Sequence, residues 1–218
     1  VTVLHKTDTD PTDFNATAMR FAIFLFVFYI AAAAHGQPGN AMTVKHFDIR
    51  LAGVKIGDMK ATRTIKDTIT AYRLESKVKV WLVVTIEMEH LTETVYHGKK
   101  LFSSISVSKT NNGTYTSSVT WKDGHYQTKV DTYKYKNSKP IDEIVECSIA
   151  SFYFDEPVNI RQTLADTYGT LAPVKKVNPG SYEVDTQGNI NKYLYKNGSF
   201  VKASLYTKVR YEVIARND

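Results

Sequence analysis

Histidines, two adjacent acids and one cysteine are the side chains of this sequence whose types suit metal binding or catalysis. The histidines that follow residue 37 are His46, His90, His97 and His125. No two of them stand at the spacing of metal ligands on one helix face, and the motif HExxH is absent. Because a zinc site needs three or four convergent ligands, we predict no metal and no cofactor.

His46 and Asp48 lie two residues apart in an alternating stretch. Side chains alternate between the faces of a strand, so this pair shares one face and Phe47 and Ile49 share the other. We predict that the apolar pair faces the core and that the imidazole and the carboxylate face water. Such a solvated pair is not expected to act in catalysis.

Asp155 and Glu156 are adjacent acids that precede Pro157. The two carboxylates of a glycosidase stand about 5–9 Å apart, whereas neighbours on a strand point to opposite faces. We predict that Asp155 caps a turn. A G-x-S-x-G nucleophile elbow and a phosphate-binding glycine loop are also absent, so we assign no catalytic residue.

Cys147 is the single cysteine, so a disulfide within the chain is excluded. Its neighbours in "IVECSIASF" are largely apolar. We predict a buried thiol, with pairing to another molecule as the alternative. An apolar setting also argues against the thiolate that nucleophilic catalysis with a distant histidine would need.

Aromatic residues are the candidates for contact with a ligand. Tyr133 and Tyr135 stand at strand spacing, as do Tyr193 and Tyr195, and further aromatics gather between residues 152 and 168. The selected ligand-binding residues are Phe152, Tyr153, Phe154, Tyr168, Tyr193 and Tyr195. The alternative is that they only pack the core, because tyrosine is a good strand former.

The elements that must position these residues follow a period of two. Apolar residues alternate with polar ones from Val201 to Val213 and from Tyr72 to Met88, which is typical of half-buried strands. Asp123-Gly124 and Asn197-Gly198 are dipeptides that favour tight hairpins. The expected strands are 45–51, 54–65, 70–81, 83–96, 99–109, 114–121, 125–136, 181–186, 190–196 and 200–214.

The pattern predicts a mainly β fold, an antiparallel meander of about ten strands that forms a curved or half-open barrel. Residues 138–180 interrupt the alternation. Apolar residues at helical spacing from Ile141 to Phe152 predict a short helix that Pro157 ends. One or two short helices are expected near 141–168, the second of them around 158–168 with its end at Gly169. This segment is expected to plug or cap the concave face of the sheet.

A leader precedes this domain. Arg20, the apolar run 21–34 and the small residues that follow are typical of a secretory signal over residues 19–36. The run is shorter than the roughly 20 apolar residues of a membrane span. We expect cleavage before Gln37, with cleavage after Ala34 as the close alternative. An uncleaved anchor or a buried helix is the competing interpretation.

Residues 1–18 are polar and lack an apolar period. Our hypothesis is that they are an upstream extension that is not translated, and the alternative is a real short leader. Residues 37–218 would then form a single β-rich domain that is exported to the periplasm or the extracellular space, with no membrane span left after cleavage.

The net charge of +6 comes from lysines and arginines that are scattered along the chain. A nucleic-acid-binding protein shows a basic patch or stripe, so we exclude nucleic acid as a partner. Weak attraction to an anionic membrane surface stays open.

Three stretches carry a family resemblance: "FDIRLAGVKIGDMKATR" at 47–63, "ASFYFDEPVNI" at 150–160 and "YEVDTQGNINKYLYKNG" at 182–198. On these stretches the chain resembles a family of uncharacterised exported bacterial proteins, domain of unknown function 6134. The "AGVKIGDM" stretch is also similar to envelope proteins with curved, half-open β-barrels. The resemblance implies the bacterial envelope and a curved antiparallel sheet, and it brings no catalytic residues.

Two functions follow as hypotheses. The first is a non-enzymatic envelope module that binds an apolar ligand, a lipid or a protein partner on the concave side of the sheet. The alternative is a hydrolase of envelope or extracellular polymers. That hydrolase requires a deep pocket in which His46 or His125 lies near Asp155 or Glu156.

Overall fold

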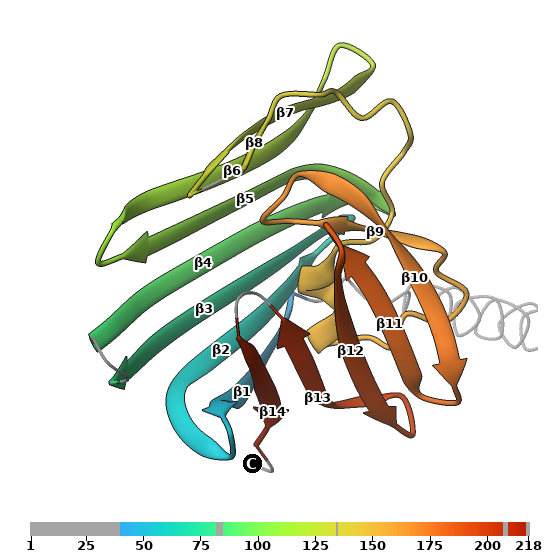
Figure 1. Ribbon diagram of the computed structural model, residues 1–218. Helices are drawn as coiled ribbons and strands as arrows, with labels where there is room; N and C mark the ends of the chain where they lie inside the picture. The colour runs from blue at the N-terminus through green and yellow to red at the C-terminus, as the bar shows by residue number, and fades with distance from the viewer. Residues whose placement is uncertain (1–39, 82–84, 134, 207–208, 217–218) are drawn as a thin grey trace, which may run out of the picture. The chain divides into compact units, whose positions relative to one another are not determined.

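Antiparallel strands make up nearly all of the structure. The computed structural model describes residues 40–81, 85–133, 135–206 and 209–216 (Figure 1). The strands are β1 (Ala41–Leu51), β2 (Val54–Lys66), β3 (Ile69–Trp81), β4 (Thr85–His97), β5 (Lys100–Thr110), β6 (Gly113–Lys122), β7 (His125–Thr132), β8 (Tyr135–Asn137), β9 (Gln162–Ala165), β10 (Thr170–Asn178), β11 (Ser181–Thr186), β12 (Asn189–Lys196), β13 (Ser199–Tyr206) and β14 (Arg210–Ala215). A short 3₁₀ helix, η1 (Ile149–Tyr153), lies between β8 and β9.

The strands form one sheet in the order β8-β7-β6-β5-β4-β3-β2-β1-β14-β13-β12-β11-β10-β9. β1 pairs antiparallel with β14, with Phe47 opposite Ala215. The sheet therefore has a first arm, β1–β8, and a second arm, β9–β14, that meet at its middle (Figure 1). β8 and β9 are the two edges and do not pair with each other, so the sheet is open. The predicted antiparallel meander in a half-open arrangement is confirmed.

The sheet has fourteen strands, whereas the alternation predicted about ten. The expected strand 125–136 is divided into β7 and β8, and the expected strand 200–214 into β13 and β14. Neither of these two strand breaks carries an Asn-Gly or Asp-Gly dipeptide. The alternation of apolar residues therefore gave no sign that one strand ends and another begins there. β9 and β10 are the other additions, and they lie in the segment where the alternation was interrupted.

Of the one or two short helices predicted near 141–168, the structure has one, the 3₁₀ helix η1, and the rest of this segment is not helical. Residues 141–145 bond instead to the first arm: the N–H of Ile141 donates to the Tyr126 carbonyl oxygen at 3.1 Å, and the Leu101 N–H donates to the Val145 carbonyl oxygen at 2.8 Å. Residues 162–165 are strand β9, paired with β10. Tertiary hydrogen bonds thus override a helical spacing of apolar residues, of which only 149–153 became helical, as η1.

Gly169 stands at the reversal between β9 and β10 and not, as was predicted, at the end of a helix. Its φ of +58° lies in the left-handed region, and its N–H donates to the Ala165 carbonyl oxygen at 2.9 Å. A Cβ at this position would lie 2.7 Å from a methyl carbon of Thr128 and from one of Val130. Glycine is therefore required here both by its backbone conformation and by close approach to β7.

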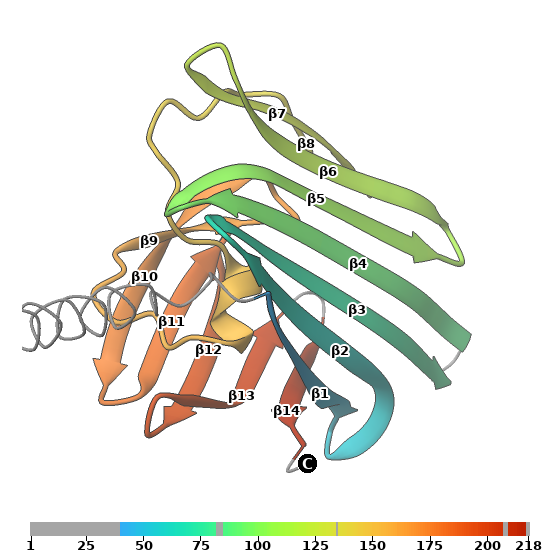
Figure 2. The same cartoon turned by 180° about the vertical axis from the view of Figure 1, so that it is seen from behind.

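The segment 147–157 fills the concave side of the sheet between the two arms (Figures 1 and 2). Toward the middle of the sheet, the Tyr153 ring packs edge-on against Phe47 of β1, with centroids 5.4 Å apart. On the second arm, Phe152 packs in the same way against Tyr193, at 5.1 Å. The segment therefore acts as the expected plug, and it holds the inner faces of both arms together.

Alternation in the strands matches alternation in burial. In β12 every second residue, Asn191, Tyr193 and Tyr195, is buried, and the residues between them are exposed. In β11, Tyr182, Val184 and Thr186 are buried, and the residues between them are half-buried. The buried face is the concave one that covers the segment 147–157. A period of two therefore identified the core face correctly.

Residues 40–218 form one compact unit. The expected leader, 19–36, and the expected upstream extension, 1–18, lie outside the described residues. Within the described ranges no helix has the length and hydrophobicity needed to cross a membrane.

Candidate functional site

A cavity of about 310 Å³ lies on the concave side of the sheet, beside the segment 149–168. Side chains from both arms and from this segment line it. Most of its wall is apolar, and the aliphatic and thioether side chains are those of Ile49, Met59, Leu74, Val78, Met88, Ile149, Leu205 and Val213. Such a wall favours an apolar occupant because desolvating it costs little.

Strand alternation places these side chains in the wall. Leu74 and Val78 stand at even positions of β3, on the same face as buried Tyr72. Met88 of β4 lies directly opposite Val78, and Met59 of β2 lies opposite Ser76, which also lines the cavity. The first arm thus presents apolar side chains from three neighbouring strands, with Ser76 between Leu74 and Val78.

A row of polar groups runs along the cavity on β4 and β5. His90 Nδ1 is 2.7 Å from Ser108 Oγ, and His90 Nε2 is 3.0 Å from Thr92 Oγ1, which is 2.9 Å from Ser106 Oγ. Burial lowers the pKa of His90 to about 4, so the imidazole is neutral at pH 7. A neutral ring donates through one nitrogen and accepts at the other, so both are satisfied by these hydroxyls.

Asp166 is a buried acid in the same wall. Its Oδ1 accepts a hydrogen bond from Ser104 Oγ at 2.7 Å, and its Oδ2 accepts one from the Ala150 N–H at 3.2 Å. Burial raises the pKa of Asp166 to about 6, although these hydrogen bonds oppose the rise. The carboxylate therefore fastens η1 to β5 and shapes the inner end of the cavity.

The structure divides the six predicted ligand-binding aromatics. Tyr153, Tyr168 and Tyr193 line the cavity. Phe152 lines a second hollow, of about 280 Å³, on the other side of η1. Phe154 and Tyr195 are buried, and line neither of these two cavities. Core packing and cavity lining thus occur together in this group, and ligand contact stays a prediction.

Sequence reasoning missed most of the wall. We assigned Met59, Leu74 and Met88 to strands but not to a site, although the alternation places them on the apolar face. His90 lies two residues after Met88 on the same strand, so the alternation also indicates that His90 faces inward. Asp166 carries no such sign, because its partners lie 62 and 16 residues away.

Asp48 and His46 share the outer face of β1, as predicted, but both are half-buried rather than fully exposed. Asp48 pairs with Arg216 at 2.7 Å, with Lys55 at 3.1 Å and with Arg50 at 3.2 Å. Hydrogen bonds from Arg216 and then Lys55 hold the pKa of Asp48 well below its usual range. This carboxylate joins the β1–β2 hairpin to the end of β14.

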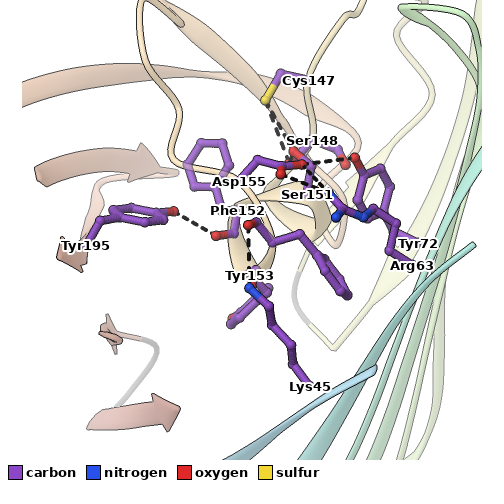
Figure 3. Close-up of polar contacts among 11 residues, drawn as sticks. Lys45, Arg63, Tyr72, Cys147, Ser148, Ser151, Phe152, Tyr153, Asp155 and Tyr195 are labelled. Carbon is purple, nitrogen blue, oxygen red and sulfur yellow. Dashed lines mark hydrogen bonds and ion pairs between the residues drawn. The ribbon is translucent and has the colours of Figure 1, made fainter. Parts of the chain in front are cut away.

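Asp155 and Glu156 reach opposite arms of the sheet. Instead of capping a turn, as predicted, Asp155 accepts hydrogen bonds from Arg63 at 2.8 Å and from the Tyr72 hydroxyl at 3.4 Å (Figure 3). Glu156 accepts one from the Tyr182 hydroxyl of β11 at 2.6 Å. The adjacent acids therefore clamp η1 to both arms, which corrects the turn-cap prediction for Asp155.

Backbone carbonyl groups of η1 are also held from both sides (Figure 3). Lys45 Nζ donates to the Tyr153 carbonyl oxygen at 3.3 Å, and the Tyr195 hydroxyl donates to that of Phe152 at 2.8 Å. Burial lowers the pKa of Lys45, and the nearby Arg63 lowers it further. These side chains satisfy carbonyl groups that the short helix leaves unpaired.

Cys147 is a free, half-buried thiol with its Sγ 3.4 Å from Ser151 Oγ (Figure 3). Ser151 in turn donates to the Ser148 carbonyl oxygen at 2.8 Å. Burial raises the pKa of the thiol, so the neutral form predominates at pH 7. The expectation of full burial is therefore met only in part, whereas the protonated state agrees with the apolar setting.

The pocket that the hydrolase hypothesis required is not formed among these groups. Neither His46 nor His125 lines the two cavities described above, and neither bonds to Asp155 or Glu156 in the described part of the chain. No cluster of three potential metal ligands occurs among the described residues.

An open antiparallel sheet around an apolar cavity defines a barrel-like β protein. The chain belongs to the family described as Domain of unknown function (DUF6134), which it matches over residues 47–216. The crystal structure of a β-barrel-like protein of domain of unknown function DUF1849 from Brucella abortus is similar over 79% of this chain and 95% of that chain, with 12% sequence identity and a TM-score of 0.45. Comparison with curated proteins finds no match.

Proposed function

We propose that this protein is an exported, non-enzymatic module that binds an apolar small molecule or lipid in the cavity between its arms. The cavity of about 310 Å³, with its apolar wall, is the observation that carries this proposal. Ligand pockets range from about 300 to 1,000 Å³ and are lined mostly by apolar and aromatic side chains. The volume suits one medium-length alkyl chain or a small ring system.

Several contacts around the cavity hold its wall without a ligand. Asp166 fastens η1 to β5, and the clamp of Asp155 and Glu156 fastens the adjoining turn to both arms. A preformed cavity lowers the conformational entropy that binding must overcome. This supports binding of a ligand rather than simple core packing.

Export is the second part of the proposal, and the sequence of residues 19–36 supports it. We place the protein in the periplasm or the extracellular space. An apolar molecule is poorly soluble there, so a cavity that shields it from water would allow the protein to carry or sense such compounds.

Native mass spectrometry of the exported protein, together with titration by the apolar fluorophore phenylnaphthylamine, tests the binding. The expected result is a co-purified small molecule, or saturable one-to-one binding of the fluorophore. A bound peptide in place of a small molecule would be recognised by its larger mass. Folded protein that shows neither a bound molecule nor saturable binding would overturn the proposal.

A further inference from the structure

Cationic groups are missing from the wall of the 310 Å³ cavity. Of the described residues that line it, none is a lysine or an arginine. His90 is neutral, and both of its ring nitrogens already face hydroxyl groups of Ser108 and Thr92. An acidic ligand would therefore lie in this cavity without a cationic partner. Burying an unpaired charge is far more costly than burying a neutral polar group.

Asp166 makes the wall less favourable still for an anion. In addition to burial, its negative charge raises the pKa of Tyr153 and of Tyr193, both of which line the cavity. The same field opposes a bound carboxylate or phosphate group. The carboxylate oxygens of Asp166 are hydrogen-bonded to Ser104 and to the Ala150 N–H, so they do not require a cationic ligand either.

Five tyrosines among the described residues line the cavity, and three of them are considered as neutral donors. Tyr153, Tyr193 and Tyr211 all line it, and none of their hydroxyl groups makes a hydrogen bond to another described residue. Burial raises the pKa of Tyr211 to about 12 and raises those of the other two as well, so all three keep their protons. The three side chains come from η1, β12 and β14, and they line the same cavity.

We infer that the ligand is uncharged: an alkyl chain or ring system that presents one neutral oxygen acceptor, as in an alcohol, ester or ketone, to Tyr153, Tyr193 and Tyr211. The inference rests on the proposed function and narrows its ligand class. An oxygen acceptor on the ligand would bond to hydroxyl groups that have no partner among the described residues. The aliphatic wall of the first arm would cover the remainder of the molecule.

Three amphiphiles with the same alkyl chain test whether the ligand is uncharged. Decanol, decanoate and decylamine are titrated into the full chain at neutral pH, with displacement of phenylnaphthylamine as the readout. Decanol is expected to bind at least about tenfold more tightly than either charged analogue. A tenfold ratio of dissociation constants corresponds to only about 1.4 kcal/mol, which is less than the cost of burying an unpaired charge. Equal or tighter binding of decanoate or decylamine would overturn the inference.

Removal of single tyrosine hydroxyl groups tests their contact with the oxygen acceptor of the ligand. Tyr211→Phe and Tyr153→Phe, made separately, are expected to weaken decanol binding about twofold to tenfold and to weaken the binding of phenylnaphthylamine, which has no oxygen atom, by a smaller factor. Tyr115→Phe is the matched control, since Tyr115 lies outside the cavity wall. Unchanged decanol affinity in both cavity variants would refute the phenol contact. If no amphiphile and no fluorophore binds to the folded wild type, the proposed function itself fails.

Discussion

Ser104 Oγ donates a hydrogen bond to the carboxylate of Asp166 at 2.7 Å, across 62 residues of sequence. Both side chains are buried, at 1% and 6% exposure. The contact connects the first arm to the turn that follows β9. It also keeps a negative charge in an apolar interior, and such a charge makes folding stability depend on pH.

Asp166→Asn should remove part of that pH dependence. The folded pKa of Asp166, about 6, lies above its ordinary value of 3.8, so the folded state binds more protons between these values. The resulting stability is fully present below pH 4 and is lost as pH rises through 6, by about 3 kcal/mol. Urea unfolding at a series of pH values should show this decline in the wild type and a smaller one in the variant. Equal slopes would contradict the assignment.

Gly57→Ala should destabilise the sheet by about 3 kcal/mol. A Cβ at Gly57 of β2 would lie 2.2 Å from the carbonyl oxygen of Lys77 and 2.9 Å from Cα of Val78, both on β3. This close approach explains the glycine in the "KIGDM" stretch. Gly98→Ala is the control, because its Cβ meets open space and only its φ of +60° causes strain, which costs about 1 kcal/mol. Equal losses in urea unfolding would contradict the close approach.

Tyr195→Phe should cost about 1–2 kcal/mol, because the buried Phe152 carbonyl oxygen would lose its donor. Tyr115→Phe, which removes an exposed hydrogen bond to the Asn112 carbonyl oxygen, should change stability by less than about 0.5 kcal/mol. Thermal or urea unfolding of the two variants measures the difference. Equal effects would show that Tyr195 does not hold η1.

The strands and the face that each buries could be predicted because a period of two survives in β3, β4, β11 and β12. The segment before β9 could not, since backbone bonds such as that between Ile141 and Tyr126 depend on tertiary structure. Similarly, three of the six chosen aromatics line the cavity, but the alternation alone cannot show where the wall is left unfilled. Asp166 escaped prediction because its partners converge only in the folded sheet.

Cys147 should react slowly with iodoacetamide at neutral pH, because the reactive species is the thiolate and burial raises the pKa of this thiol. Unfolding in urea should restore the rate of an unhindered cysteine. Mass spectrometry of the alkylated peptide at timed intervals gives both rates. A folded-state rate equal to the unfolded one would contradict a shielded, protonated thiol.

Cleavage of the leader is expected to leave a chain that begins at Gln37, or at His35 if cleavage follows Ala34. Expression in a bacterium with fractionation, followed by mass analysis of the amino terminus, identifies the site. Recovery of peptides from residues 1–18 in the native protein would show that the upstream residues are translated. Retention of residues 19–36 in the exported protein would contradict a cleavable signal.

The most direct test of ligand binding between the two arms is to fill the cavity with a larger side chain. Met88→Trp places a large ring where β4 lines the cavity, whereas Met42→Trp makes the same change at a site that is 71% exposed and outside the wall. Titration with phenylnaphthylamine should show saturable binding by the wild type and by Met42→Trp, and a loss of at least about tenfold in affinity for folded Met88→Trp. Equal affinity of all three proteins would contradict binding in this cavity.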